Sequence, residues 1–376
     1  MTALSAEERA TLGSSVRAAC TRLLPEHRLR AVAYEGALRD RGFDRPLWKA
    51  LCGQVGVASI GIPDSDQDDG CPIAAHAVIA HEVGRALAPV PFLSSAVLAT
   101  RLLIATGGAT DLLEDLAAGD RTAAAAVPTS GGRGEEAETP VAVDDAGQWR
   151  LSGSVHHVLG AAGAENIVVL ATQNGQSQLY LVDPDQSGVT ITAQRVLDAT
   201  RPMATVSLDA AAARHLPADR PVEDIVGDSV RYVIAVLTAE QVGATERILQ
   251  MAVEYARVRK QFDRPIGSFQ VIKHRCADML VELELARSAS LAAVEAIDTA
   301  DPDAPWLVSM AKAVCSEALR GAAHVNLQIH GGIGFTWEHA VGMYVKRART
   351  DEVLFGSPAE HWSVLERSAA LIGVTS

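Results

Sequence analysis

The stretch Tyr255–Gln270 most constrains how this chain can fold, because it closes one long helical pattern and opens another. Asp263-Arg264-Pro265 interrupts the pattern, and proline suits the first turn of a following helix because its missing N–H would be unpaired there. Upstream of the interruption, apolar residues recur near the 3.6-residue period of a buried helix face, at Val233, Leu237, Val242, Ile248, Ala252 and Tyr255. The stretch therefore predicts two long helices joined by a bend.

The bend carries a compact basic cluster made of Arg257, Arg259, Lys260 and Arg264. Arg259 presents a planar fork of donors that fits a phosphate, and Phe262 and Phe269 offer flat faces for a stacked ring. A solvated charged turn would contain the same residue types. The bend alone therefore leaves a ligand site and a plain surface turn as alternatives.

Two motifs together point to a family. Arg259-Lys-Gln-Phe262, followed by Pro265-Ile266 and Phe269-Gln270, resembles a signature of the acyl-CoA dehydrogenases. The run from Gln328 to His339 resembles the second signature of that family, at a fitting separation, and a weaker resemblance covers nearly the whole chain. The resemblance implies an α+β fold with an N-terminal helical domain, a central antiparallel β-sandwich or barrel, and a C-terminal helical bundle.

The sequence pattern divides the chain in the same way. Residues 1–120 show helical spacing, and residues 121–220 carry short β-rich runs between Gly, Asp, Asn and Pro clusters. We expect strands within 123–127, 141–143, 167–172, 178–182, 189–192 and 203–207. Residues 221–376 return to helical patterns typical of a bundle. We expect helices at 226–260, 266–298, 304–329, 338–349 and 358–371.

Composition limits the partners and the compartment. A formal net charge of −13 argues against nucleic acid as a partner, since a phosphate backbone requires a basic face. The five cysteines are scattered, and no apolar run is long enough to span a bilayer. The N-terminus lacks the basic-then-apolar order of a signal peptide. We therefore expect a cytoplasmic protein that is not associated with membranes.

Two segments invite a metal-site interpretation, and neither supports it. The acidic run Asp64–Gly70 lacks the glutamate that ends an EF-hand calcium loop, so a solvated loop is the better interpretation. His156 and His157 are adjacent, and adjacent residues on a regular strand point to opposite faces. No metal site is predicted.

The resemblance implies FAD-dependent α,β-dehydrogenation of an acyl-CoA thioester, with an electron-transfer flavoprotein as the electron acceptor. In that family FAD crosses a subunit boundary, and the two C-terminal signatures of one subunit hold the adenine and pyrophosphate end of its neighbour's FAD. The matching positions in this chain are all intact. They are Arg259, Gln261, Phe262, Ile266, Phe269, Gln328, Gly331 and Gly332. Glycines at 331 and 332 would let the backbone approach the cofactor closely, although a simple helix C-cap also explains them.

The flavin-ring end departs from the family pattern. The segment Val127–Gly134 lacks the expected Gly-Ser-Asp turn. Alignment through Leu151–Ser154 places His157 and Leu159 where the family covers the flavin and hydrogen-bonds to it, and leucine has no donor for that bond.

The catalytic base is missing from both places where the family carries it. Phe355 stands at the commoner position and Val233 at the alternative position on the long helix. Glu240 lies two turns further along the same helix face, which makes it a weak candidate. A structural, salt-bridged glutamate is the better interpretation of Glu240.

Three hypotheses follow. In the first, this chain resembles the non-basic subunit, the one without the catalytic base, of heteromeric actinobacterial dehydrogenases for steroid side chains. Those enzymes are α2β2 tetramers in which an unlike partner supplies the base and the ring pocket. In the second, it forms a homotetrameric dehydrogenase with Glu240 as a displaced base. In the third, it is a flavin-free scaffold. The acyl group is not evident from the sequence.

Overall fold

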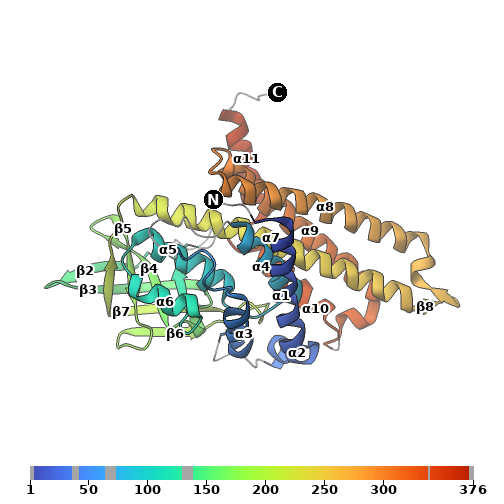
Figure 1. Ribbon diagram of the computed structural model, residues 1–376, viewed down its shortest axis with the longest axis horizontal. Helices are drawn as coiled ribbons and strands as arrows, with labels where there is room; N and C mark the ends of the chain where they lie inside the picture. Colours follow the sequence, from blue (N-terminus) through green and yellow to red (C-terminus); the bar gives the residue numbers. More distant parts are fainter. Residues whose placement is uncertain (1–3, 36–41, 64–72, 129–138, 338, 372–376) are drawn as a thin grey trace.

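The computed structural model describes residues 4–35, 42–63, 73–128, 139–337 and 339–371. In Figure 1 the strands gather at one end of an elongated molecule, and the hairpin labelled β8 lies at the other end. The helix α7 (Val222–Val258) runs between the two ends. Its 37 residues give a length of roughly 55 Å at 1.5 Å per residue, so α7 is the axis of the fold.

The N-terminal part is helical within the described residues. A capping box between Ser5 and Glu8 begins the first helix, and both orphan backbone donors are satisfied there. The elements are α1 (Ala6–Leu23), α2 (Glu26–Glu35), α3 (Arg45–Val55), α4 (Ile73–Ala86), the π-helix η1 (Phe92–Ala99), α5 (Thr100–Thr106) and α6 (Thr110–Ala118). Every residue of η1 is buried, and its Ser95 hydroxyl accepts a bond from the backbone N–H of Ala123 at 3.0 Å, which fixes η1 on the sheet.

The central part is a sheet of seven strands whose pairing closes on itself. Strands β4, β5, β7, β3 and β2 form a ring, while β1 pairs with β4 and β6 with β7. The strands are β1 (Ala123–Ala126), β2 (Val141–Asp145), β3 (Gln148–Leu159), β4 (Asn166–Gln173), β5 (Gln176–Val182), β6 (Val189–Ala193) and β7 (Met203–Leu216). The pairs β1–β4 and β2–β4 are parallel, which departs from the purely antiparallel expectation, and the remaining pairs are antiparallel.

The long strand β3 is not among the strands expected from the sequence. Its register against β7 shifts between Val155 and Val158, and His157 has a left-handed φ of 58°. This bulge places His156 and His157 both on the exposed surface. The expectation that the two histidines point to opposite faces is therefore wrong, because it assumed a regular strand.

The C-terminal part packs α7 against α8 (Gln270–Asp298) and α9 (Ala304–His330), with α10 (Val341–Val353) and α11 (Pro358–Leu371) on α9. The helix expected from residue 266 begins at Gln270 and follows a short 3-10 turn η3 (Ile266–Ser268). Pro265 lies in a two-residue strand rather than in a helical first turn, which corrects that expectation.

The helices α4 and α7 cross with their backbones in contact. A Cβ added at Gly84 would overlap the carbonyl oxygen of Glu240, and one added at Gly243 would overlap that of His81. Only glycine permits this approach. No space for a ligand remains between α4 and α7 at this crossing.

Some expectations fall outside what the structure describes. The acidic run Asp64–Gly70 and most of the segment Val127–Gly134 lie outside the described residues. The division into domains at residues 120 and 220 stays a prediction. Among the described helices, none combines the length and the hydropathy that a membrane crossing requires.

Candidate functional site

The first signature folds into a hairpin that ends α7. The short strands β8 (Lys260–Gln261) and β9 (Arg264–Pro265) pair, and the two residues between them, Phe262 and Asp263, have φ of 53° and 62°. Two left-handed residues in a row are the geometry of a tight two-residue hairpin turn. The N–H of Ile266 donates to the carbonyl of Arg259 at 2.8 Å and closes the hairpin base.

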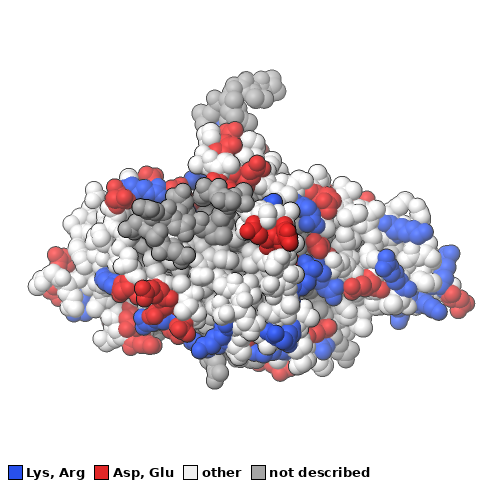
Figure 2. Space-filling view, viewed as in Figure 1, with Lys and Arg blue, Asp and Glu red and all other residues white. Residues whose placement is uncertain are grey.

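The hairpin presents its charges to solvent. Arg257, Arg259, Lys260 and Arg264 are all exposed, and Figure 2 shows Lys and Arg gathered at this end of the molecule. Phe262 is 85% exposed and its ring is free to stack on a ligand. The Arg264 guanidinium lies 4.2 Å from the Phe269 centroid, so one face of Phe269 is already covered.

The second signature lies beside the first. The helix α9 ends at His330, and Gly331 turns the chain with φ of 60° into η4 (Gly331–Phe335). The Gly331 N–H caps α9, yet a Cβ at Gly331 or Gly332 would meet nothing within 4 Å. The two glycines therefore end the helix and also leave an open backbone surface.

We call the eight matched positions of both signatures the nucleotide clamp. The rings of Tyr255 on α7 and His330 on α9 stack at 4.2 Å, so the structure brings the two halves together. Exposed guanidinium donors, an exposed ring and uncovered glycine backbone are the groups that a diphosphate and a flat heterocycle require. The described residues thus fit the adenine and pyrophosphate end of FAD.

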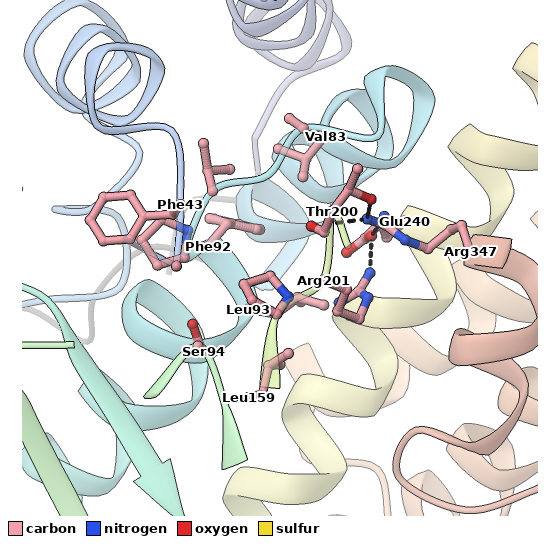
Figure 3. Close-up of a pocket in the computed structure, with 16 residues that line it drawn as sticks. Phe43, Val83, Phe92, Leu93, Ser94, Leu159, Thr200, Arg201, Glu240 and Arg347 are labelled. Atoms are coloured by element: carbon pink, nitrogen blue, oxygen red, sulfur yellow. Dashed lines mark hydrogen bonds and ion pairs between the residues drawn. The ribbon is translucent and has the colours of Figure 1, made fainter. Parts of the chain in front are cut away.

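The region expected to hold the flavin ring differs from the nucleotide clamp. A pocket at the inner edge of the sheet is lined by Phe92, Leu93, Leu159, Arg201, Glu240 and Arg347 among others (Figure 3). Its volume is about 30 Å³, whereas ligand sites span roughly 300–1,000 Å³. We call this pocket the ring pocket because Leu159, which the alignment places at the flavin, is among its lining residues; His157 is exposed and does not line it. Among the described residues, which do not include 129–138, this pocket is smaller than a flavin ring requires.

Charged side chains fill the space beside the ring pocket. Arg347 on α10 donates through Nε to Asp198 at 2.6 Å, through Nη1 to Glu240 at 2.6 Å, and through Nη2 to the Thr200 hydroxyl at 2.8 Å. Figure 3 shows the Arg347 and Arg201 side chains both directed at Glu240. Arg347 is 1% exposed, so it is a buried cation fully held by partners.

Arg201 completes what we call the buried ion cluster, formed by Asp198, Arg201, Glu240, Arg347 and Asp351. Arg201 donates to Glu240 through Nη2, and its Nε lies 3.0 Å from Asp351 Oδ1. The cluster joins the loop before β7 to α7 and α10. Three carboxylates face two guanidinium groups, so the cluster carries one more acidic group than basic groups.

Burial sets the protonation of the cluster. Burial raises the pKa of Asp351 to about 6, because desolvation outweighs the attraction of Arg201 and Arg347. Burial acts in the same direction on Asp198, yet Arg347 holds the pKa of that carboxyl below its usual value. Burial also works against the charge of Arg347, but the surrounding carboxylates raise its pKa above the usual range. Asp351 is therefore the group that gives up its charge first as pH falls towards 6.

Neither family position for the base can accept a proton in this chain. Phe355 is 5% exposed and Val233 is fully buried. Glu240 lies in the buried ion cluster, where its Oε1 accepts from both Arg201 and Arg347. The role of Glu240 as a base stays a prediction, and this geometry argues for the salt-bridged structural role instead.

The nucleotide clamp and the ring pocket lie far apart on one chain. A rise of 1.5 Å per residue puts Arg259 roughly 28 Å along α7 from Glu240. The clamp faces the end of the molecule away from the sheet (Figure 1). If the clamp binds the adenine end of FAD, the flavin ring of that FAD would therefore have to contact another chain.

Sequence reasoning missed the buried ion cluster and the Tyr255–His330 stack. The members of the cluster come from three separate segments, and none of them belongs to a local motif. The only signal was the spacing of Arg347 and Asp351, four residues apart on one helix, whose side chains lie 3.9 Å apart. That spacing is common on solvated helices.

Comparisons with known proteins agree with the two signatures. A sequence model described as "Acyl-CoA dehydrogenase, C-terminal domain" matches residues 234–370. The acyl-CoA dehydrogenase IpdE2 of Mycobacterium tuberculosis is 33% identical over 94% of this chain and 95% of its own length. The acyl-CoA dehydrogenase FadE27 of the same organism is 33% identical over 91% of this chain and 90% of its own.

Solved structures support the same fold. A variant of the Tcur3481–Tcur3483 steroid ACAD has a TM-score of 0.85 at 27% identity and covers 98% of this chain and 99% of its own. The ChsE4–ChsE5 complex from Mycobacterium tuberculosis has a TM-score of 0.85 at 27% identity and covers both chains fully. The expected helix–sheet–helix fold is confirmed. This chain is a member of the acyl-CoA dehydrogenase family of oxidoreductases.

Proposed function

We propose that this chain is the non-catalytic subunit of an FAD-dependent acyl-CoA dehydrogenase, which lends its nucleotide clamp to the FAD of an unlike catalytic partner. The partner would supply the ring pocket and the base. Two chains of each kind would form an α2β2 tetramer, and an electron-transfer flavoprotein would accept the electrons.

The observation that carries this proposal is the state of the ring pocket. A volume of about 30 Å³ beside the buried ion cluster supports a chain that holds no flavin ring of its own. The contact between the α4 and α7 backbones at Gly84 and Gly243 leaves no room for an acyl chain between the two helices at Glu240. A chain whose own ring pocket is this small would use its exposed clamp to bind the FAD of another chain.

This chain's residues would act in binding rather than in chemistry. When bound, FAD supplies the hydride acceptor for α,β-dehydrogenation. The Arg259 guanidinium would pair with the diphosphate, and the open backbone at Gly331 and Gly332 would let it approach closely. Phe262 would cover the adenine face. The acyl-CoA would lie in the partner.

The similar structures add a second line of support. One of them is named as a steroid ACAD with two different chain names, and another is named as a complex of two differently named chains. We extend both properties to this chain as part of the proposal. The partner would then be a dehydrogenase homologue that carries glutamate at the position of Phe355, and the substrate would be a steroid-derived acyl-CoA.

The purified chain tests the proposal before any partner is known. Alone, it should bind little FAD and oxidise no acyl-CoA, since its ring pocket is filled. Strong flavin absorbance together with acyl-CoA oxidation by the chain alone would contradict the proposal. In that case the variant Glu240→Gln decides the mechanism: lost turnover with retained FAD would establish the homotetramer with Glu240 as the base.

A further inference from the structure

Three aromatic rings lie in contact where the two halves of the nucleotide clamp meet, two of them stacked and the third tilted. Tyr255 on α7 and His330 at the end of α9 stack at 4.2 Å with planes 21° apart. The His339 ring, which precedes α10, lies 4.6 Å from His330. Nδ1 of His330 lies 3.0 Å from the carbonyl oxygen of Asn326, which can only accept, so Nδ1 carries the proton. We call these three residues the ring stack.

Tyr255 and His330 are each linked directly to a residue of the nucleotide clamp. The carbonyl of Tyr255 accepts from the N–H of Arg259 at 2.9 Å, which sets the direction in which the chain leaves α7. His330 directly precedes Gly331, whose φ of 60° opens the glycine surface. A change in the spacing of Tyr255 and His330 would therefore move Arg259 relative to Gly331.

One side of the ring stack borders open space. All three rings line a hollow of about 660 Å³ between α1, α2, α7 and the start of α10. Leu24, Leu29 and Met251 border the same hollow without filling it. Buried side chains along α7 and α9, Ala252, Ala256 and Ile329 among them, hold the two helices together, and the ring contacts add to this packing where the helices end beside the hollow.

We propose that Tyr255 and His330 are positioning residues, which hold the two halves of the nucleotide clamp at the separation that the diphosphate and adenine of FAD require. The inference rests on the proposed function, because it concerns the affinity of the clamp for a partner's FAD. It goes beyond that function by assigning a role to two residues outside the matched positions of the signatures.

The electrostatic surroundings give this role a pH signature. Burial lowers the pKa of His330 and of His339, so both rings are neutral at pH 7. The charged groups facing the pair are Glu26 and Arg30 on α2, Arg247 on α7, and each histidine for the other. A histidine whose pKa is lowered in the folded chain stays neutral there below the usual value of about 6.5, while the unfolded chain already takes up the proton, so stability begins to fall below that pH. The stack itself weakens, and the clamp should loosen, only as the pH falls through the lowered pKa of His330.

The test measures the FAD dissociation constant of the complex of this chain with its catalytic partner, by flavin fluorescence, at pH 7.5 and pH 5.5. His330→Ala and Tyr255→Leu remove the stack and should each weaken FAD binding about three- to tenfold, the value of one aromatic pair. The double variant should bind FAD no more weakly than the worse single variant, because both changes remove the same contact.

His330→Phe keeps an aromatic ring that does not titrate, and it should reduce the additional loss of FAD affinity at pH 5.5. His324→Ala, on the exposed face of the same helix, is the matched control and should bind FAD normally.

Two outcomes separate this inference from the proposed function. If Arg259→Ala releases FAD while His330→Ala and Tyr255→Leu bind it normally, the positioning role is wrong and the proposed function stands. If Arg259→Ala also keeps FAD, the proposed function fails. A lower melting temperature of the flavin-free chain in His330→Ala, with an unchanged FAD dissociation constant, would show a purely structural stack and would also overturn the inference.

Discussion

The hairpin end and the middle of α7 differ in how their charged side chains are placed. At the hairpin end, four cationic side chains are exposed beside open glycine backbone. In the middle of the helix, two guanidinium groups and three carboxylates are buried together and paired with one another. Exposed cations remain available to an anionic ligand, whereas a buried and paired set fills its own site. The comparison teaches that one chain of this fold can keep half of a cofactor site and close the other half.

The largest expected effect comes from breaking the buried half. Arg347→Met leaves Asp198 and Glu240 buried with one cation fewer, which should destabilise the chain by about 3–5 kcal/mol. Chemical denaturation of the purified chain measures this change. Arg349→Met, two residues along the same helix and 46% exposed, should change stability by less than about 0.5 kcal/mol. Equal effects of the two variants would show that burial and pairing do not distinguish the cluster.

Breaking the exposed half should change binding instead of stability. Arg259→Ala removes a charge-assisted contact to the diphosphate and should weaken FAD binding in the complex about 10- to 100-fold. Flavin fluorescence of the reconstituted complex measures the dissociation constant. Arg257→Ala, in the same exposed cluster but outside the signature, should cost less than about threefold. The assignment of Arg259 fails if the order of the two variants is reversed.

The closed crossing of α4 and α7 can be tested through its glycines. Gly84→Ala puts a methyl group against the carbonyl of Glu240 and should destabilise the chain by about 1–3 kcal/mol. Gly227→Ala, on the exposed part of α7 with open space around it, should instead stabilise by about 0.5–1 kcal/mol. Urea midpoints of both variants decide the sign. A neutral Gly84→Ala would mean that the helices can separate, and an acyl chain could then enter.

The smallest effect concerns the surplus carboxylate. The raised pKa of Asp351 gives a stability contribution that is complete below about pH 4 and is lost as pH rises through about 6. Asp351→Asn should remove this dependence and raise stability at pH 7 by on the order of 1 kcal/mol, because the lost attraction to Arg201 offsets part of the gain. Melting temperatures from pH 4 to pH 8 measure it. A variant less stable than the parent at pH 7 would show that the ion pair outweighs desolvation.

The sequence predicted the features that arise from local patterns. The long C-terminal helices carry sustained apolar periodicity, and their positions were close to those observed. The family, and with it the helix–sheet–helix order, followed from two contiguous motifs around Arg259 and Gly331, and is confirmed. The FAD-contact roles of those motif residues stay predictions. The structure adds how exposed these motif residues are and how close the two motifs lie to each other.

The features that sequence reasoning missed depend on distant segments or on irregular backbone. Strand β3 contains Gly153 and a bulge at His157, which break the alternation that marks a strand. Pro265 was assigned to a helix because the two left-handed residues before it carry no glycine to signal a hairpin. The closure of the ring pocket needs Arg201, Glu240 and Arg347 together, and no local pattern joins them.

The number of FAD molecules per assembled complex tests the central claim most directly. Flavin absorbance and native mass of the complex with the catalytic partner should give about one FAD for each pair of unlike chains, since only the partner offers a ring pocket. The melting temperature of the partner with its bound FAD should differ between preparations with and without this chain. Two FAD molecules per pair, or a full set in tetramers of this chain alone, would contradict the account.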